Sequence, residues 1–143
     1  MTAKIYNELC GLFDNLQSIF LLIARLVVAY GFYEPALMKW NDINSVASWF
    51  ATLGIPFPTL SAYLASTAEL LGVVLIAIGF LTRIMSIPLM IVMVVAIFTV
   101  HIGNGFSAGD NGFEIPLYYL IFLGLFLSNG AGKFSVDYLI FKK

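Results

Sequence analysis

The stretch TLSAYLASTAELLGVVLIAIGFL, residues 59–81, decides the class of fold. It contains a single charged side chain, Glu69, and only the dipeptide Thr82-Arg83 separates it from a second apolar run, residues 84–103. A helix of about 20 apolar residues crosses the roughly 30 Å hydrocarbon core of a bilayer. Two such runs with so short a connection predict an antiparallel hairpin of transmembrane helices.

Two further apolar stretches, residues 17–38 and 114–129, extend the pattern. Of the 143 residues, 61% are hydrophobic and 10% are charged, and the mean hydropathy is +0.97. Soluble domains carry about 25% charged residues, so this composition is typical of membrane proteins. Lipid cannot satisfy backbone polar groups, and runs without alternation exclude barrel strands. We therefore predict an all-α fold: one membrane domain over residues 1–143, an integral membrane bundle of four transmembrane helices at about 17–38, 59–81, 84–103 and 114–129.

Short amphipathic segments flank these helices and are expected to lie at the membrane interface, at about residues 3–16, 44–53 and 134–143. The orientation follows from the lysines and arginines outside the helices. The side that holds both termini and the 82–83 connection carries five of these residues: Lys4, Arg83, Lys133, Lys142 and Lys143. The opposite side carries only Lys39. We therefore expect a multi-pass protein with both termini in the cytoplasm.

Composition also limits the chemistry. The net charge is −1, and no basic surface indicates a nucleic-acid partner. Cys10 is the only cysteine and His101 the only histidine, so an internal disulfide and a haem held by two histidines of this chain are excluded. The role of Cys10 stays unassigned.

Two ionisable residues interrupt the apolar stretches near their middles. A charge at the centre of a membrane helix costs at least about 2.5 kcal/mol and usually faces a partner inside the bundle. Arg25 and Glu69 are expected to form such a pair. Two interpretations stay open: the pair only sets the helix register, or it belongs to a substrate, cofactor or proton site.

A second group of polar residues is expected at the outward ends of the helices. His101 closes the third apolar stretch, Glu114 opens the fourth, and Tyr118 follows one turn later. With Glu69 and Lys39 they could converge on one polar pocket. Each also has a structural explanation, since a lone histidine often packs within a core and a carboxylate in a first helical turn is favoured by the helix dipole. Glu69, His101 and Glu114 are the right ligand types for a metal but show no spacing motif, so no metal site is assigned.

The chain resembles the DoxX family of small membrane proteins over nearly everything after residue 20. The matching stretches, in chain order, are LLIARLVVAYGF (21–32), Lys39, WFATLGIPFPTLSAYLASTAELLG (49–72), GFLTR (79–83), VHIGNGF (100–106), NGFEIPLYYL (111–120) and GAGKFSVD (130–137). One departure is Val73, where many members carry a second glycine.

The resemblance implies a four-helix bundle in the bacterial cytoplasmic (inner) membrane. It also implies that Arg25, Lys39, Glu69, His101 and Glu114 match the polar residues characteristic of the family. Members are linked to subunits of quinone-reducing thiosulfate systems or terminal oxidase systems, to oxidative and thiol stress complexes, and to operons for copper-binding peptides. The leading hypothesis is an accessory or redox-associated membrane subunit, with a quinone as candidate ligand; whether it is itself part of an oxidoreductase enzyme stays open.

Two alternatives remain beside this hypothesis. The first is a small transporter or proton-coupled carrier, and the second is a non-catalytic assembly or scaffold protein in metal or oxidative stress. The expected partners are the lipid bilayer, a membrane or periplasmic protein, and in one alternative a second copy of the chain.

Overall fold

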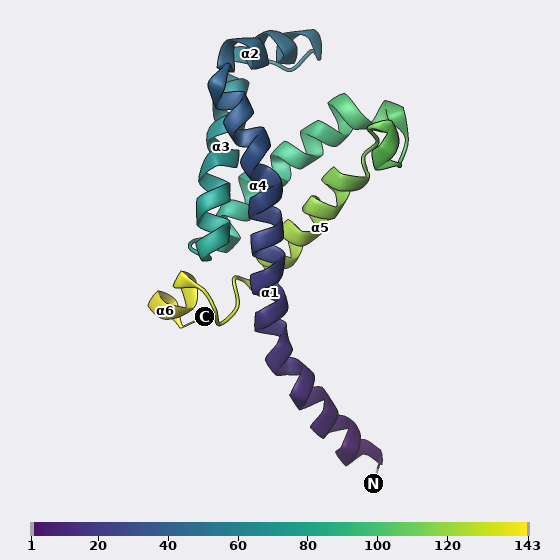
Figure 1. Cartoon of the computed structure of the whole chain (residues 1–143), viewed down its shortest axis with the longest axis vertical. Coiled ribbons are helices and arrows are strands. Elements are labelled where there is room, and N and C mark those ends of the chain that lie inside the picture. The colour runs from purple at the N-terminus through teal and green to yellow at the C-terminus, as the bar shows by residue number, and fades with distance from the viewer. Residues whose placement is uncertain (1, 143) are drawn as a thin grey trace.

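The computed structural model describes residues 2–142, and the side chains of residues 10–142 except 12, 14 and 15. Every regular element among them is a helix (Figure 1). The all-α prediction is therefore confirmed.

The first helix, α1, is Thr2–Asn41, a continuous helix of 40 residues. At 1.5 Å per residue it is roughly 60 Å long, and its N-terminal part projects beyond the rest of the molecule (Figure 1). The expected segment 3–16 and the first apolar stretch are thus one helix, and no proline interrupts it before Pro35. Most side chains of the amphipathic face expected for residues 3–16, Lys4 included, lie outside the described ones, as does Lys143.

A short helix, α2 (Ile43–Thr52), follows and lies across the end of α1 and α3 (Figure 1). Asp42 caps it, since its carboxylate accepts hydrogen bonds from the Ser45 N–H at 3.1 Å and the Ser45 hydroxyl at 2.6 Å. This cap fixes the start of α2, and α2 connects α1 to α3.

The helices α3 (Pro58–Ile78) and α4 (Thr82–Ala96) form the expected hairpin, but the turn is at Gly79–Leu81. The prediction of a Thr82-Arg83 connection is therefore wrong, because both residues already belong to α4. The chain leaves α3 early since Gly79 adopts a left-handed conformation (φ 71°) and the N–H of Phe80 bonds back to the Leu75 carbonyl, a closure typical of helix C-termini.

Beyond α4 the helix changes its winding. A π-helical turn, Ile97–His101, and a 3₁₀ turn, Ile102–Asn104, continue it into a loop with a second 3₁₀ turn, Ala108–Asp110. The helix α5 (Glu114–Asn129) returns along α4, and α6 (Val136–Phe141) ends the described chain.

Three helical segments of the described chain are long and apolar enough to cross a membrane: Leu16–Asn41, Pro58–Ile78 and Thr82–Asn104. The fourth expected segment, α5, is a shorter apolar helix of 16 residues, roughly 24 Å long. Length and composition therefore support a membrane protein with several crossings.

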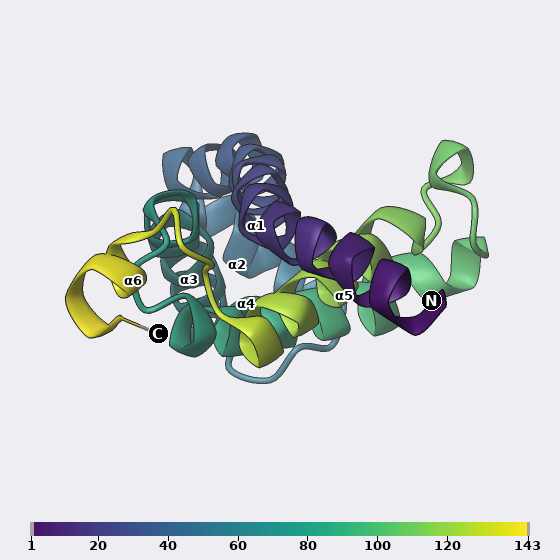
Figure 2. The same cartoon turned by 90° about the horizontal axis from the view of Figure 1, so that it is seen from below.

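The helices associate as two pairs. α1 packs on α3, and α4 packs on α5 (Figure 1). The pairs share a core built from Val28, Ile76, Leu89, Leu123 and Phe126, all fully buried. From this core α4 and α5 lean away from α1 and α3, so the molecule is V-shaped in Figure 1. Figure 2 shows the α4–α5 connection on one side of the molecule and α6 on the other.

Candidate functional site

Arg25 lies at the end of the bundle where α3 ends and α6 follows, called the lower end, and is completely buried. Its guanidinium donates hydrogen bonds to the carbonyls of Ile76 (3.3 Å) and Ala77 (3.2 Å), in the last turn of α3, and to the carbonyl of Phe134 (2.5 Å). The expected pair of Arg25 with Glu69 is therefore wrong. Arg25 instead compensates the negative end of the α3 dipole and its free carbonyls.

The neighbouring C-terminal segment closes over this end of the bundle. The N–H of Asp137 donates to the Gly79 carbonyl at 2.9 Å. The Asp137 carboxylate accepts from the N–H groups of Leu81 (2.7 Å) and Thr82 (3.0 Å), which are free donors at the start of α4. Arg25 and Asp137 thus tie the segment after α5 to the α3–α4 turn.

Glu69 pairs with Lys39. The Lys39 Nζ lies 2.5 Å from Glu69 Oε1, with the Glu69 side chain 2% exposed and the Lys39 side chain 23% exposed. The second carboxylate oxygen, Oε2, is buried and has no hydrogen-bond partner among the described residues. Arg25 and Lys39 are 14 residues apart on α1, roughly 21 Å along the helix, so one carboxylate on the antiparallel α3 cannot meet both.

A cleft of about 800 Å³, the upper cleft, opens between the two helix pairs, and Lys39 and Glu69 line it. Residues of α1, α2, α3, α4, α5 and the π-helical turn form its walls. Most of them are apolar. The polar exceptions are Lys39, Ser61, Thr67, Glu69, Thr99, His101 and Tyr119.

His101 reaches this cleft from the end of the π-helical turn. Its Nδ1 lies 2.8 Å from the carbonyl oxygen of Asn111. A carbonyl only accepts, so Nδ1 carries the proton, and in the neutral ring Nε2 is left as an acceptor. π-helical turns are rare and often occur at functional sites. The position of His101 in such a turn therefore supports its inclusion in the candidate site.

Of the neighbouring tyrosines Tyr118 and Tyr119, only Tyr119 lines the cleft. Its hydroxyl sits against α1 at Gly31, where a Cβ atom would lie less than 2 Å from it. Its ring stacks at a tilt on Phe32, with centroids 5.4 Å apart. The sequence signal was the glycine in α1, since only a residue without a side chain admits a ring this close.

Glu114 and Tyr118 pair with each other outside the cleft lining. The Tyr118 hydroxyl donates to Glu114 Oε1 at 2.9 Å, and the Ala108 N–H donates to Oε2 at 2.9 Å. Glu114 therefore holds the 3₁₀ turn of the α4–α5 connection. Of the six residues predicted for the polar cluster, the cleft takes Lys39, Glu69 and His101. Arg25 lies at the other end.

No group of three His, Cys, Asp or Glu side chains in the described part of the chain is arranged to hold a metal ion. In particular, Glu69, His101 and Glu114 do not meet, because Glu114 is engaged by the α4–α5 connection.

Comparison with known proteins identifies the relatives of this bundle. Residues 20–102 match the DoxX family, and these include Arg25, Lys39, Glu69 and His101. The chain belongs to the DoxX family. No solved structure matches it.

Several bacterial proteins are similar to this DoxX chain. A Haemophilus influenzae protein is 37% identical over 85% of the chain and 83% of its own length. A Bacillus subtilis protein named "Putative oxidoreductase CatD" is 27% identical over 85% of the chain and 87% of its own length. The Escherichia coli protein named "Inner membrane protein YphA" is 34% identical over 50% of the chain and 51% of its own length.

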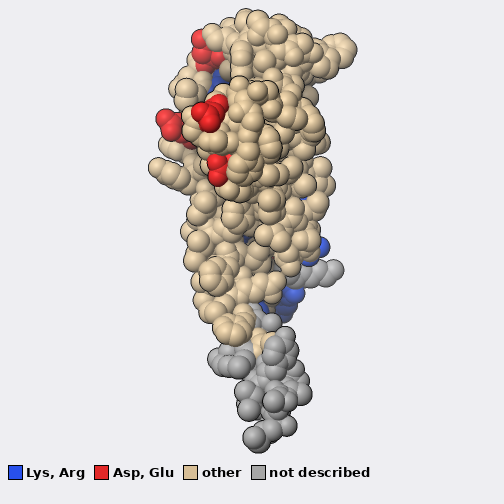
Figure 3. All heavy atoms as spheres, turned by 90° about the vertical axis from the view of Figure 1, so that its right-hand side faces the viewer, with Lys and Arg blue, Asp and Glu red and all other residues tan. Residues whose placement is uncertain are grey.

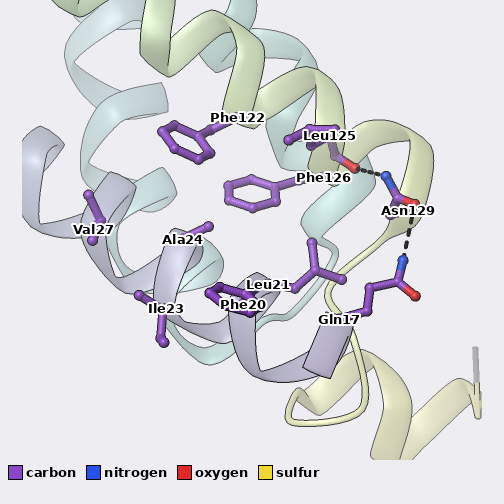
Figure 4. A pocket seen from close by; sticks show the side chains of 10 residues that line it. All are labelled: Gln17, Phe20, Leu21, Ile23, Ala24, Val27, Phe122, Leu125, Phe126 and Asn129. Atoms are coloured by element: carbon purple, nitrogen blue, oxygen red, sulfur yellow. Dashed lines mark hydrogen bonds between the residues drawn. The ribbon is translucent and has the colours of Figure 1, made fainter. Parts of the chain in front are cut away.

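This DoxX protein has a second, smaller cleft of about 530 Å³ between α1 and α5 (Figure 4). Apolar side chains form its walls, including Phe20, Ile23 and Phe122. Its polar end is formed by Gln17 and Asn129, whose side-chain amides lie 3.4 Å apart. It contains none of the predicted site residues and has no ionisable lining, which suits an acyl chain rather than a polar ring.

In the view of Figure 3, most acidic side chains lie towards the α2 end of the DoxX bundle and most lysines and arginines towards the α6 end. At the α2 end, Asp42 caps α2 and Asp110 lies in the α4–α5 connection. At the α6 end, Arg83 is in the first turn of α4, Lys133 precedes α6 and Lys142 ends it. The upper cleft with Lys39 and Glu69 is therefore at the acidic end.

Proposed function

We propose that this DoxX protein is a redox-associated membrane subunit whose upper cleft binds a quinone-type ring. The observation that carries the proposal is an apolar cleft of about 800 Å³ with the Lys39–Glu69 ion pair and His101 in its lining. Small-molecule sites usually have volumes of roughly 300–1,000 Å³, apolar walls and a few convergent polar groups. A flat ring with oxygen substituents matches such a lining.

The cleft offers both surfaces and hydrogen-bonding groups to this ring. Phe32, Trp49, Phe50 and Tyr119 supply aromatic walls. Lys39 uses one N–H on Glu69 and keeps two for a ring oxygen. His101 adds an acceptor at Nε2.

Electron transfer is assigned to a partner protein. With one histidine and one cysteine, the chain supplies neither a pair of histidines for a haem nor an internal dithiol. A membrane or periplasmic partner, with or without a second copy of this chain, would exchange electrons with the bound ring. The name of the Bacillus subtilis relative supports the link to redox chemistry.

The membrane topology we propose has four crossings in the bacterial inner membrane, with α5 as the fourth. At roughly 24 Å it is short, but a bilayer adapts to a short helix at modest cost. Both termini would face the cytoplasm, because the lysines and arginines around α6 and the α3–α4 turn satisfy the positive-inside rule. α2 and α6 would lie at the two interfaces. The name of the Escherichia coli relative supports the inner membrane.

The test is ligand binding by the whole chain purified in detergent. Calorimetric titration with a short-chain benzoquinone should give a saturable signal. Ala65→Phe, which fills the upper cleft, should weaken binding about tenfold or more. Ala24→Phe, which fills the second cleft, is the matched control and should bind as the unmodified protein does. Absence of binding, or equal loss in both variants, would refute the proposal.

A further inference from the structure

Glu69 carries a buried carboxylate oxygen that has no hydrogen-bond partner in the described part of the chain. Its Oε1 accepts from Lys39, whereas Oε2 has no partner in the described part of the chain. The residue is 1% exposed, and it forms part of the lining of the cleft. An unsatisfied buried carboxylate oxygen is costly and rare in folded proteins. Three other buried atoms also lack a partner among the described residues: Arg25 Nε, Ser66 Oγ and Thr82 Oγ1. Of these four residues only Glu69 lines the cleft, where a bound group can complete its hydrogen bonding.

The missing group is a hydrogen-bond donor. Glu69 forms a salt bridge with Lys39, and a carboxylate held in such a pair only accepts hydrogen bonds. With Nδ1 donating to the Asn111 carbonyl, the Nε2 of a singly protonated His101 ring offers the same chemistry to the cleft as an acceptor. Two acceptors in an apolar lining favour a ligand that brings O–H groups.

We infer that the upper cleft selects the hydroxyl-bearing, reduced form of the ring, the quinol, over the quinone. This inference rests on the proposed function. A quinol hydroxyl placed at the ion pair can donate to Glu69 Oε2 and accept from a free Lys39 N–H at the same time. A quinone carbonyl can accept from Lys39 but leaves Oε2 unpaired. A site built around a polar group discriminates against analogues that leave that group unpaired.

Lys39 controls access to the carboxylate. Its side chain is 23% exposed whereas that of Glu69 is 2% exposed, so a ligand meets the ammonium first. The flexible four-carbon stem allows the ammonium to shift towards a ring oxygen. The ammonium is bonded to Oε1, so Oε2 stays available to a hydroxyl while Lys39 donates to the ring oxygen. A hydroxyl that only donates a hydrogen bond transfers no proton, and the net charge of the cleft does not change.

The test compares three ligands with the same ring on the purified chain: a quinol kept reduced without oxygen, the corresponding quinone, and the dimethyl ether of the quinol. The quinol should bind about tenfold or more tightly than the quinone, and the ether no more tightly than the quinone. Equal binding of quinol and ether would show that donation is irrelevant and overturn the inference. If quinone and quinol bind equally, the proposed function stands and this inference fails; if none of the three binds, the proposed function fails.

Variants assign the preference to Glu69. Glu69→Gln replaces one acceptor oxygen by a donor, so the ratio of quinone to quinol dissociation constants should fall towards one. Glu34→Gln, which changes an exposed carboxylate on α1 outside the cleft lining, should leave the ratio unchanged. A folded Glu69→Gln protein with the original ratio would overturn the assignment. The ligand series on the unmodified chain decides the preference even if this variant does not fold.

Discussion

Gly79 lies so close to Arg25 that a Cβ atom on the glycine would lie 2.0 Å from the guanidinium Nη1. The same glycine ends α3 in a left-handed conformation. One residue therefore both turns the chain and leaves room for the buried cation that binds the α3 carbonyls. The lower end of the bundle depends on this contact, as the upper end depends on the Lys39–Glu69 pair.

Gly79→Ala should lower the stability of the protein markedly. A left-handed conformation costs a residue with a side chain about 1–2 kcal/mol, and the new Cβ would also displace the Arg25 guanidinium. Thermal unfolding in detergent measures the loss. Gly124→Ala, in the interior of α5 where a Cβ meets nothing within 4 Å, should unfold at the original temperature or above it. Equal behaviour of the two variants would contradict the role of Gly79.

The sequence was a good guide to the helices and a poor guide to their contacts. Apolar stretches of about 20 residues are a local property, so the helical class followed directly from residues 59–81. The partner of Glu69 depends on the register of α3 against α1, and the apolar part of α1 holds two cations, Arg25 and Lys39. Arg25 was the expected partner because it stands near the middle of its apolar stretch, as Glu69 does. In the structure the carbonyls at the end of α3 bind Arg25, and Lys39 binds Glu69.

The ends of α4 were hard to predict for a similar reason. The N-terminal cap of α4 comes from Asp137, which is 55 residues away from Thr82. The π-helical turn that carries His101 has no strong local signal either. Long-range hydrogen bonds decide both features, and a single sequence does not show them.

Asp137→Ala should loosen the start of α4 and the segment before α6. The substitution leaves the N–H groups of Leu81 and Thr82 without their cap, a loss of about 1 kcal/mol. Hydrogen exchange should speed up at residues 80–83 and 133–138. Asp110→Ala, an exposed acidic residue in the α4–α5 connection, is the matched control and should not change exchange there. Unchanged protection in the first variant would show that the cap contributes nothing.

Acidic pH should loosen α2 by protonating its cap. Hydrogen bonds from the Ser45 hydroxyl and N–H lower the pKa of Asp42. A carboxyl with a lowered pKa in the folded state stabilises that state above its unfolded pKa, and the contribution is lost as pH falls through the folded pKa. Protection of the Ser45 amide should therefore fall below about pH 4. Asp42→Asn should remove this pH dependence; if the amide keeps it, another group is responsible.

Lys39→Met and Glu69→Gln should be strongly coupled in stability. Lys39→Met leaves an uncompensated carboxylate that is almost fully buried, which we expect to cost about 2–4 kcal/mol. Glu69→Gln removes that charge and should cost less, because Lys39 is partly exposed and can be hydrated. Adding Glu69→Gln to Lys39→Met should then recover stability, with a coupling energy of about 1 kcal/mol or more. Denaturant unfolding of the four proteins in detergent gives this energy, and additive losses would show that the two side chains do not form a stabilising pair. Arg25→Met is the matched comparison, because it removes the second cation of the apolar part of α1. Arg25 binds carbonyls rather than Glu69, so its loss should add to that of Glu69→Gln without coupling.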